Sequence, residues 1–404
     1  MTYFKRKILA SICWIFSYLI ILPLQANPWV ESDDAYLRSD LQLLSDAGLI
    51  SVPVNTFPLP WREISEQIIN SSPNNLSDNV RSAYFHLRYK INAAKEGYGN
   101  NSLKLKASQE SIPSSYGSRN DVKWGVFSSA AFDELRFAMK ISANYAQYYD
   151  KENFQYNLDD SYFAVTTGKT NFFISTQNQW WSPSWIQSLS AEQRIHPSYE
   201  LGMEKTFIDL PAIGNVYVKS GINQLRSSDD WKYSWRSRLS LRPTEMLELS
   251  LTRFDFMDSQ NNDVEEHDYQ TSTDARLSLF SITDLPLGIY TQYIINDSQS
   301  EFNDYLLGSD YSVRAYDNQI RFVFEYSHID EKYSRYSLGT YVQMENDHQW
   351  QLFLHRNNTE SNGNQLVGAY RFLLYKGMLS LSFLFSDAEF SDPVNAGISW
   401  ELRF

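Results

Sequence analysis

From about residue 100 to its last residue, this chain alternates apolar and polar side chains with a period of two, and no other feature limits its fold as strongly. In the closing stretch AGISWELRF, the apolar side chains are those of Ile398, Trp400, Leu402 and Phe404. Because successive side chains of a β-strand point to opposite faces, this rhythm predicts strands with one apolar face. An aromatic last residue in register with the pattern predicts that the end of the chain is held in a sheet rather than frayed.

The alternating region divides into about eighteen segments, each about 8 to 11 residues long, which is the length of a tilted strand that crosses a membrane. In one segment, Arg321 and Glu325 alternate with Phe322 and Phe324. An arginine that faces lipid at mid-depth costs roughly 2–4 kcal/mol, so we expect the charged face to line a lumen. The segments lie near residues 102–109, 124–133, 135–145, 158–168, 171–179, 198–206, 214–223, 232–241, 245–254, 273–282, 286–295, 305–314, 318–327, 334–343, 348–355, 364–373, 377–385 and 395–404.

The connections between these segments alternate between short and long. GKT at 168–170 and RPTE at 242–245 are short, whereas 180–197 and 255–272 are long. Outer-membrane barrels show this asymmetry, with tight periplasmic turns and long outer loops. The sequence therefore predicts a transmembrane antiparallel β-barrel of about 18 strands. A soluble antiparallel sandwich also alternates, but so many uniform strands fit that architecture less well.

The first 26 residues read as an export signal. Three basic residues at positions 5–7 precede an apolar run at 8–22, and Leu24-Gln25-Ala26 fits a small-residue cleavage site. An uncleaved anchor is the alternative, although the apolar run is short for a spanning helix. The single cysteine, Cys13, lies inside this segment, so we expect no disulfide in the mature chain.

Residues 27–100 have a helical rhythm instead. Ser32 is a candidate N-cap for a helix whose leucines, such as Leu37 and Leu41, recur on one face, and Gly48 is a candidate stop. A proline-rich bend follows, and the stretches 61–69 and 76–97 predict two more helices. We expect a small periplasmic helical domain at 27–100 and the barrel at 101–404, because an even strand count leaves both barrel ends on the periplasmic side.

The composition agrees with a membrane barrel. Aromatic residues make up 15% of the chain, and Tyr and Trp are typical of membrane interfaces. The net charge of −13 argues against nucleic acid as a partner.

Two stretches resemble the Wzi-type capsule assembly family. The first is DDAYLRSDLQLLSDAGLISVPVNTFPLPWREI, residues 33–64, in which a helix with an "L..L.DAG.I" pattern leads into a "P…PLPW" bend. The second is NQWWSPSWIQSLSAEQRIHPSYELGMEK, residues 178–205, with a tryptophan-rich turn, a Ser-Leu pair and an arginine followed by a proline. Where the family pattern has Gly-Pro-Gly, this chain has Ser182-Pro183-Ser184.

The resemblance implies an outer-membrane barrel of about eighteen strands with a periplasmic helical bundle. It also implies a lectin-like, non-enzymatic role, in which the protein binds and anchors capsular or exopolysaccharide at the bacterial cell surface. A porin-like channel for small anionic solutes is the alternative function, and an outer-membrane enzyme is a third reading.

The loop at 180–197 is the first candidate site. Its tryptophans can stack on sugar rings, and its glutamine, arginine and histidine side chains can hydrogen-bond to hydroxyls and carboxylates. Packing of the tryptophans into the barrel mouth or the interfacial girdle is the competing explanation. The candidate polysaccharide-binding residues are Trp181, Trp185, Gln187, Gln193, Arg194 and His196.

A set of basic residues expected in the lumen is the second candidate site. It offers an anion path, or a structural network of ion pairs with carboxylates such as Glu325 and Glu401 that fills the lumen. The members are Arg136, Lys140, Lys232, Arg236, Arg238, Arg321 and Arg403.

Support for catalysis is weak. The chain has no G-x-S-x-G nucleophile motif, no metal-ligand spacing and no phosphate-binding loop. We therefore expect no enzyme activity, no catalytic residues, no metal and no cofactor. The expected partners are capsular or exopolysaccharide and outer-membrane lipid, with contact to the polysaccharide export machinery left open, and the protein is expected to act as a monomer.

Overall fold

The computed structural model describes residues 29–404 apart from 117, 121, 135, 150, 152, 191–196, 227–230, 260–266, 297–303, 330–332, 345, 359–362 and 388–393. The predicted signal peptide at 1–26 lies outside the described residues.

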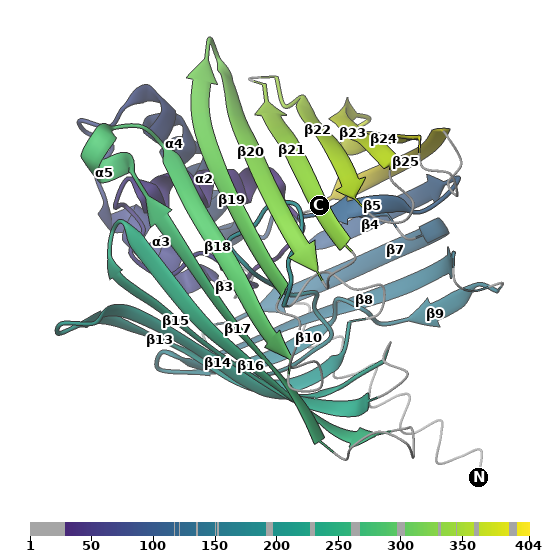
Figure 1. Cartoon of the computed structure of the whole chain (residues 1–404), viewed down its shortest axis with the longest axis horizontal. Helices are drawn as coiled ribbons and strands as arrows, with labels where there is room; N and C mark the ends of the chain where they lie inside the picture. Colours follow the sequence, from purple (N-terminus) through teal and green to yellow (C-terminus); the bar gives the residue numbers. More distant parts are fainter. Residues whose placement is uncertain are drawn as a thin grey trace.

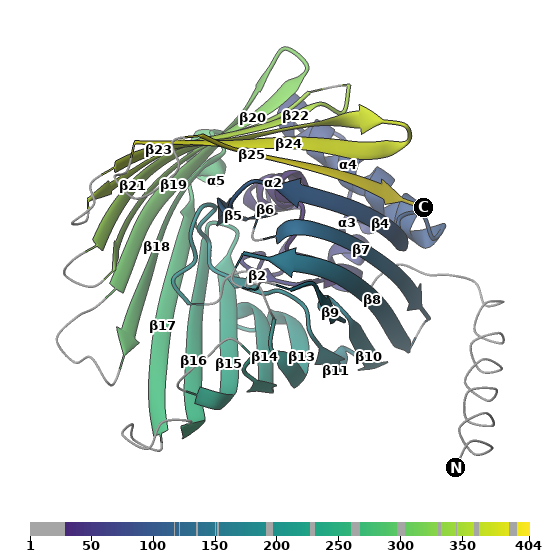
Figure 2. The same ribbon diagram turned by 90° about the vertical axis from the view of Figure 1, so that its right-hand side faces the viewer.

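Eighteen of the described strands form one closed antiparallel barrel (Figures 1 and 2). The main sheet has 19 strands, and the short β9 (Gln155–Asn157) pairs only with β8, so the other 18 make the ring. Pairing of β8 with β10 and of β25 with β4 closes it. The predicted barrel is thus confirmed. The ring consists of β4 (Asn101–Ser108), β7 (Val122–Asp133), β8 (Phe137–Tyr148), β10 (Tyr162–Thr167), β11 (Thr170–Ser175), β13 (Tyr199–Leu210), β14 (Gly214–Gln224), β15 (Trp231–Thr244), β16 (Leu247–Ser259), β17 (His267–Ser278), β18 (Leu287–Asn296), β19 (Asp304–Ala315), β20 (Asn318–Ile329), β21 (Tyr333–Gln343), β22 (Gln349–Asn358), β23 (Gly363–Leu374), β24 (Gly377–Ser386) and β25 (Val394–Arg403).

The end of the chain is part of the ring. The backbone N–H of Phe404 donates to the carbonyl of Asn101 at 3.0 Å, and the N–H of Asn101 donates to the carbonyl of Phe404 at 3.0 Å. The last strand therefore pairs with the first and leaves no open edge, as a sheet in lipid requires.

The two faces of the strands differ as the alternation predicts. On β15, Trp235 and Leu239 are exposed on the outside, whereas Arg236 and Arg238 are buried inside the ring. On β20, Phe322 and Phe324 are exposed, and Arg321 and Glu325 are buried. Contact between water and so large an apolar exterior would be unfavourable, so lipid surrounds the ring and the ring spans a membrane.

Three helices lie at one end of the barrel: α2 (Ala35–Asp46), which packs against inward-facing wall residues, α3 (Trp61–Asn70) and α4 (Asp78–Lys95) (Figure 1). Arg62 donates to the carbonyl of Gly168 in the β10–β11 turn, and Arg314 beside the β19–β20 turn donates to the carbonyl of Asp78. We call this the helical end and the opposite one the distal end. None of the helices in the described part of the chain is long and apolar enough to cross a membrane.

Helix α2 begins two residues later than its sequence signals indicate. The N-cap is Asp34, whose Oδ1 accepts from the N–H groups of Tyr36 and Leu37 at 3.0 Å each. Ser32, the predicted cap, donates instead to the carbonyl of Asn178. The predicted stop is confirmed, because Gly48 adopts a φ of +76° directly after the helix.

The helices are not an independent core. Their buried side chains form one apolar cluster with inward-facing barrel residues such as Tyr341 and Phe353. Short ladders tie the same region together: β1 (Trp29–Val30) with β3 (Leu59–Pro60), and β2 (Thr56–Phe57) with β12 (Trp180–Trp181). The remaining elements are the hairpin β5 (Ile112–Ser115) and β6 (Ser118–Asn120) and the one-turn helix α5 (Phe280–Thr283). A domain boundary at residue 100 stays a prediction.

Candidate functional site

Part of the 180–197 loop lies inside the barrel. Residues 180–190, which we call the plug, lie inside the lumen. Pairing of Trp180 with Phe57 and of Trp181 with Thr56 attaches the plug to the segment after α2. Trp181 and Trp185 are both 0% exposed. The tryptophan-rich sequence favours this location because a large ring gains the most when it is removed from water.

A single carboxylate holds the tip of the plug. Glu325, on the inner face of β20, accepts backbone N–H bonds from Trp185 at 2.6 Å, Ile186 at 3.2 Å and Gln187 at 3.3 Å. The Tyr290 hydroxyl donates to the same carboxylate at 2.8 Å. Consecutive N–H groups that converge on one anion form a nest, so the loop conformation depends on this charge.

The ring of Trp185 lies between two guanidinium groups. Arg38 of α2 is 4.2 Å from its centroid, and Arg321 of β20 is 4.6 Å from it. The Tyr116 ring covers Arg38 at 4.3 Å, and Arg38 also donates to the carbonyl of Pro183 at 3.0 Å. The helix, the plug and the wall are therefore joined by cation–π contacts in a dry interior, where these contacts are strongest.

The base of the plug is held by an amide. Gln292 of β18 accepts from the Ser182 hydroxyl at 2.9 Å and from the Leu189 N–H at 3.0 Å, and its Nε2 donates to Ser190 at 2.8 Å. Both polar atoms of this buried side chain are thus used.

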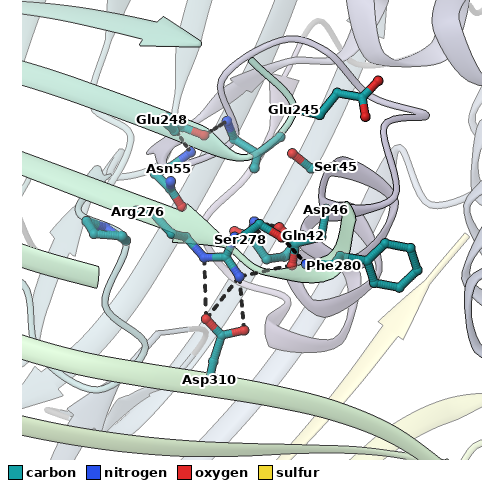
Figure 3. Close-up of polar contacts among 12 residues, drawn as sticks. Gln42, Ser45, Asp46, Asn55, Glu245, Glu248, Arg276, Ser278, Phe280 and Asp310 are labelled. Carbon is teal, nitrogen blue, oxygen red and sulfur yellow. Dashed lines mark hydrogen bonds and ion pairs between the residues drawn. The ribbon is translucent and has the colours of Figure 1, made fainter. Parts of the chain in front are cut away.

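Ion pairs fasten α2 to the barrel wall (Figure 3). Arg276 of β17 donates to Asp46 at 2.5 and 3.0 Å and to Asp310 of β19 at 3.1 Å. Arg321 also pairs with Asp310 and donates to the Ser39 hydroxyl and carbonyl at 2.9 Å. Arg276, Asp46 and Asp310, which Figure 3 labels, are nearly excluded from solvent. Removing any one of them would leave a buried charge without its partner, so the network stabilises the fold only while it is complete.

A second set of contacts fixes the chain after α2. Glu248 accepts from the N–H groups of Val54 at 3.1 Å and Asn55 at 3.0 Å (Figure 3). Arg242 donates to the carbonyl of Ile50 at 2.6 Å. The proline-rich bend therefore closes the helical end of the lumen with satisfied backbone groups, and the lumen is filled at this level.

Two ionisable groups at the helical end titrate away from their ordinary range. Burial raises the pKa of Glu63 in α3 to about 6. Burial alone would lower the pKa of His86 in α4, but the adjoining Asp40 carboxylate of α2 outweighs it and raises that pKa. The His86–Asp40 pair thus joins α4 to α2 most firmly when the imidazole is charged.

The structure divides the predicted polysaccharide-binding residues. Trp181 and Trp185 are buried in the plug, and neither ring offers a free face. Gln187 is half-buried at the plug tip, where the Ser327 hydroxyl donates to its side-chain oxygen at 3.2 Å. The other three, Gln193, Arg194 and His196, lie outside the described residues.

The predicted luminal basic residues fall into two groups. Arg236, Arg238 and Arg321 are buried in the lumen, and Arg238 pairs with Asp274 at 2.8 Å. The others lie nearer the rims: Lys140 pairs with Glu31 at 2.6 Å, Arg403 pairs with Asp33 at 2.8 Å and with Glu401 at 2.5 Å, and Arg136 and Lys232 are exposed. The paired members favour the ion-pair network over an anion path.

A row of inward polar groups near the distal end was not foreseen. Glu200, Asn223 and Ser234 are neighbours on β13, β14 and β15 and are 0–3% exposed. Within the described part of the chain, Glu200 Oε1, Asn223 Oδ1 and Ser234 Oγ have no hydrogen-bond partner. Unsatisfied buried polar atoms are rare and indicate a missing partner. Only the strand register brings the three together, so their sequence positions gave no signal.

Comparisons with known proteins agree with this architecture. The model of the family described as capsule assembly protein Wzi matches residues 101–258. The chain is also similar in structure to Wzi of Escherichia coli, an outer membrane protein involved in group 1 capsule assembly that is described as a carbohydrate-binding β-barrel. The TM-score is 0.82 at 16% identity, over 94% of this chain and 100% of that one. The resemblance to the Wzi-type family is therefore confirmed.

Two proteins of Pseudomonas aeruginosa, OccK3 (OpdO) and the outer membrane protein OpdK, are more distant in structure. OccK3 (OpdO) has a TM-score of 0.52 at 8% identity over 75% of this chain and 94% of its own. OpdK has a TM-score of 0.51 at 9% identity over 75% of this chain and 97% of its own. No curated protein sequence matches this chain. The distant barrels share the fold alone.

Proposed function

We propose that this chain is an outer-membrane barrel of the Wzi type that binds capsular or exopolysaccharide and anchors it at the cell surface. The observation that carries the proposal is a lumen filled by α2 and the plug, with unsatisfied polar groups on the distal wall. A filled barrel serves as a rigid platform, and hydroxyl-rich chains satisfy buried polar atoms of this kind. The likeness to a carbohydrate-binding barrel supports the same reading.

The distal wall and the 180–197 loop are the proposed sugar contacts. Glu200 and Asn223 lie where β13 and β14 meet the distal end, directly after the 180–197 loop. We infer that Gln187, Gln193, Arg194 and His196 complete the surface, with Arg194 suited to an acidic sugar because guanidinium binds carboxylate bidentately. Trp181 and Trp185 then act as anchors that hold the loop.

The porin-like alternative is disfavoured by the pairing of the luminal arginines. Arg238 and Arg321 lie against Asp274 and Asp310, which neutralise them, and the plug and α2 occupy the lumen beside them. A small anion would have to displace both carboxylates and plug. We therefore expect no steady current through the native protein in a planar bilayer.

We also propose that the protein acts as a monomer that meets the export machinery at its helical end. The ring closes within one chain and needs no partner strand. On α4, Phe85 and Tyr89 are 54% and 69% exposed and lie one turn apart, which is a surface suited to a protein partner. We expect no enzyme activity, so polysaccharide incubated with the protein should keep its chain length.

The proposal is tested in the producing strain by separating cell-bound from released polysaccharide. Deleting the gene should release polysaccharide into the medium while total synthesis stays unchanged. Restoring the gene with Asn223→Leu should leave release high, because leucine removes the free acceptor. Ser220→Ala, on the outer face of the same strand, is the matched control and should restore retention. Full retention by cells without the gene would refute the proposal.

A further inference from the structure

The unsatisfied polar row on the distal wall ends beside an aromatic ring. Asn223 of β14 lies opposite Glu200 of β13 on one side and opposite Ser234 of β15 on the other. Ser234 in turn lies opposite Phe256 of β16. Side chains directly opposite each other on adjacent strands have Cβ atoms about 5 Å apart, so a single sugar ring can contact several members of this row.

The atoms of the row that lack a partner are mainly acceptors. Asn223 Oδ1 and the Oε1 of an ionised Glu200 can only accept hydrogen bonds, whereas Ser234 Oγ can donate or accept. The other carboxylate oxygen of Glu200 is already engaged, because it accepts from Gln179 Nε2 and lies 3.7 Å from Lys219 Nζ. Two adjacent free hydroxyls on a sugar would supply the two missing donors, and ester or ether oxygens would supply none.

The aromatic end of the row separates a sugar from simpler occupants. The Phe256 side chain is half-buried, and its ring stacks on that of Phe254 with centroids 6.4 Å apart and 11° between the planes. A sugar ring has an apolar C–H face that packs on an aromatic ring and a hydroxyl edge that donates hydrogen bonds. A water molecule or a metal ion could satisfy the acceptors but has no use for the ring.

One arginine side chain, which we call the strap, closes the row. Arg236 of β15 donates through Nη2 to the hydroxyl of Ser198, the residue before β13, at 2.9 Å. Strand β14 lies between β13 and β15, and Arg236 is opposite Gly221 of β14, so the strap crosses β14 beside Asn223. This crossing explains why Asn223 is 0% exposed although its Oδ1 has no partner. A ligand therefore reaches the row when the strap leaves Ser198.

We propose that this row selects a sugar unit that carries two adjacent free hydroxyls, and that O-acylation of those hydroxyls prevents binding. The inference rests on the proposed function, because the sugar unit belongs to the polysaccharide that the barrel anchors. One hydroxyl donates to Glu200 Oε1 and the other to Asn223 Oδ1, while the ring face packs on Phe256. The Arg236 strap turns away from Ser198 to admit the sugar.

The inference is tested with the full mature chain in detergent and the producer's own polysaccharide in three forms. The first form is as isolated, the second is chemically O-acetylated, and the third is O-acetylated and then de-esterified with mild base. Acetylation should weaken binding about a hundredfold, the factor that two hydrogen bonds supply when one of them goes to a charged group. De-esterification should restore the affinity, which excludes damage to the polymer.

Variants separate the parts of the site. Asn223→Leu removes one of the two acceptors, so acetylation should then cost only about tenfold. Ser220→Ala, on the outer face of the same strand, is the matched control and should keep the full cost. Phe256→Ala should weaken the isolated and acetylated forms alike. Ser198→Ala removes the bond that holds the strap and should tighten binding of the de-esterified form.

The possible failures of the inference and of the proposed function can be told apart. Equal binding of the acetylated and de-esterified forms by the unaltered protein would overturn the inference and leave the proposed function standing. An acetylation cost that Asn223→Leu leaves unchanged would do the same, because the selectivity would then come from another part of the protein. Absence of binding to all three forms by well-folded protein would overturn the proposed function and the inference with it.

Discussion

Replacing Glu325 with glutamine removes the charge on which the plug tip depends. The carboxylate accepts four bonds, from the N–H groups of Trp185, Ile186 and Gln187 and from the Tyr290 hydroxyl. Glutamine keeps one acceptor oxygen, and its amide nitrogen must face donors. Hydrogen bonds to charged groups contribute about 1.5–3 kcal/mol each and do not add, so the loss should be about 3–5 kcal/mol.

A loss of this size shifts the equilibrium between a closed barrel, with the plug tip held by Glu325, and an open barrel, with the plug tip released. About 4 kcal/mol corresponds to roughly a thousandfold shift between closed and open plug. We therefore expect Glu325→Gln to show open-channel events in a planar bilayer and a lower thermal midpoint in detergent. Ser327→Ala is the control on the same face of the same strand, because it removes only the bond to the Gln187 side chain. A silent Glu325→Gln channel with the stability of the unaltered protein would refute the role given to this carboxylate.

Three further changes test the helical end. Arg276→Gln should lower the free energy of unfolding by about 3–5 kcal/mol in a denaturant titration, because it leaves Asp46 as a buried carboxylate without its cation, and adding Asp46→Asn should recover part of the loss. Glu63→Gln should stabilise the protein by about 2 kcal/mol at pH 8 and change nothing at pH 4, because a pKa raised to about 6 gives stability that is present below pH 4.5 and lost as the pH rises through 6. His86→Gln should destabilise the protein at low pH instead. The raised pKa of His86 gives stability that is complete below about pH 6.5 and lost as the pH rises through the folded-state pKa, so the variant should have a lower free energy of unfolding than the unaltered protein at pH 5.5. A difference between the two proteins that grows toward pH 9 would contradict the His86–Asp40 pair.

The barrel strands are readable from the sequence because lipid and lumen impose a local rule on every second residue. The segment predicted at 318–327 is β20 (Asn318–Ile329), and that at 214–223 is β14. The prediction at 273–282 was displaced, since β17 is His267–Ser278 and Phe280–Thr283 forms α5. A short apolar run satisfies a strand or one helical turn equally well, and only the following turn decides.

The interior of the lumen was much less predictable. Alternation says that Arg276 and Glu325 point inward, but not that they meet Asp46 or the Trp185 backbone, more than a hundred residues away. A long loop has no periodic pattern, so its tryptophans are as compatible with an exposed binding surface as with a buried plug. The three unsatisfied groups on the distal wall, among them Asn223, depend on register across three strands, which one sequence does not encode visibly.

Binding of the producer's own purified surface polysaccharide to the immobilised protein in detergent tests the central claim most directly. A closed platform with a polar distal wall should give saturable binding that weakens about tenfold in Asn223→Leu and stays intact in Ser220→Ala. Equal binding to an unrelated polysaccharide, or no binding at all by well-folded protein, would contradict the account.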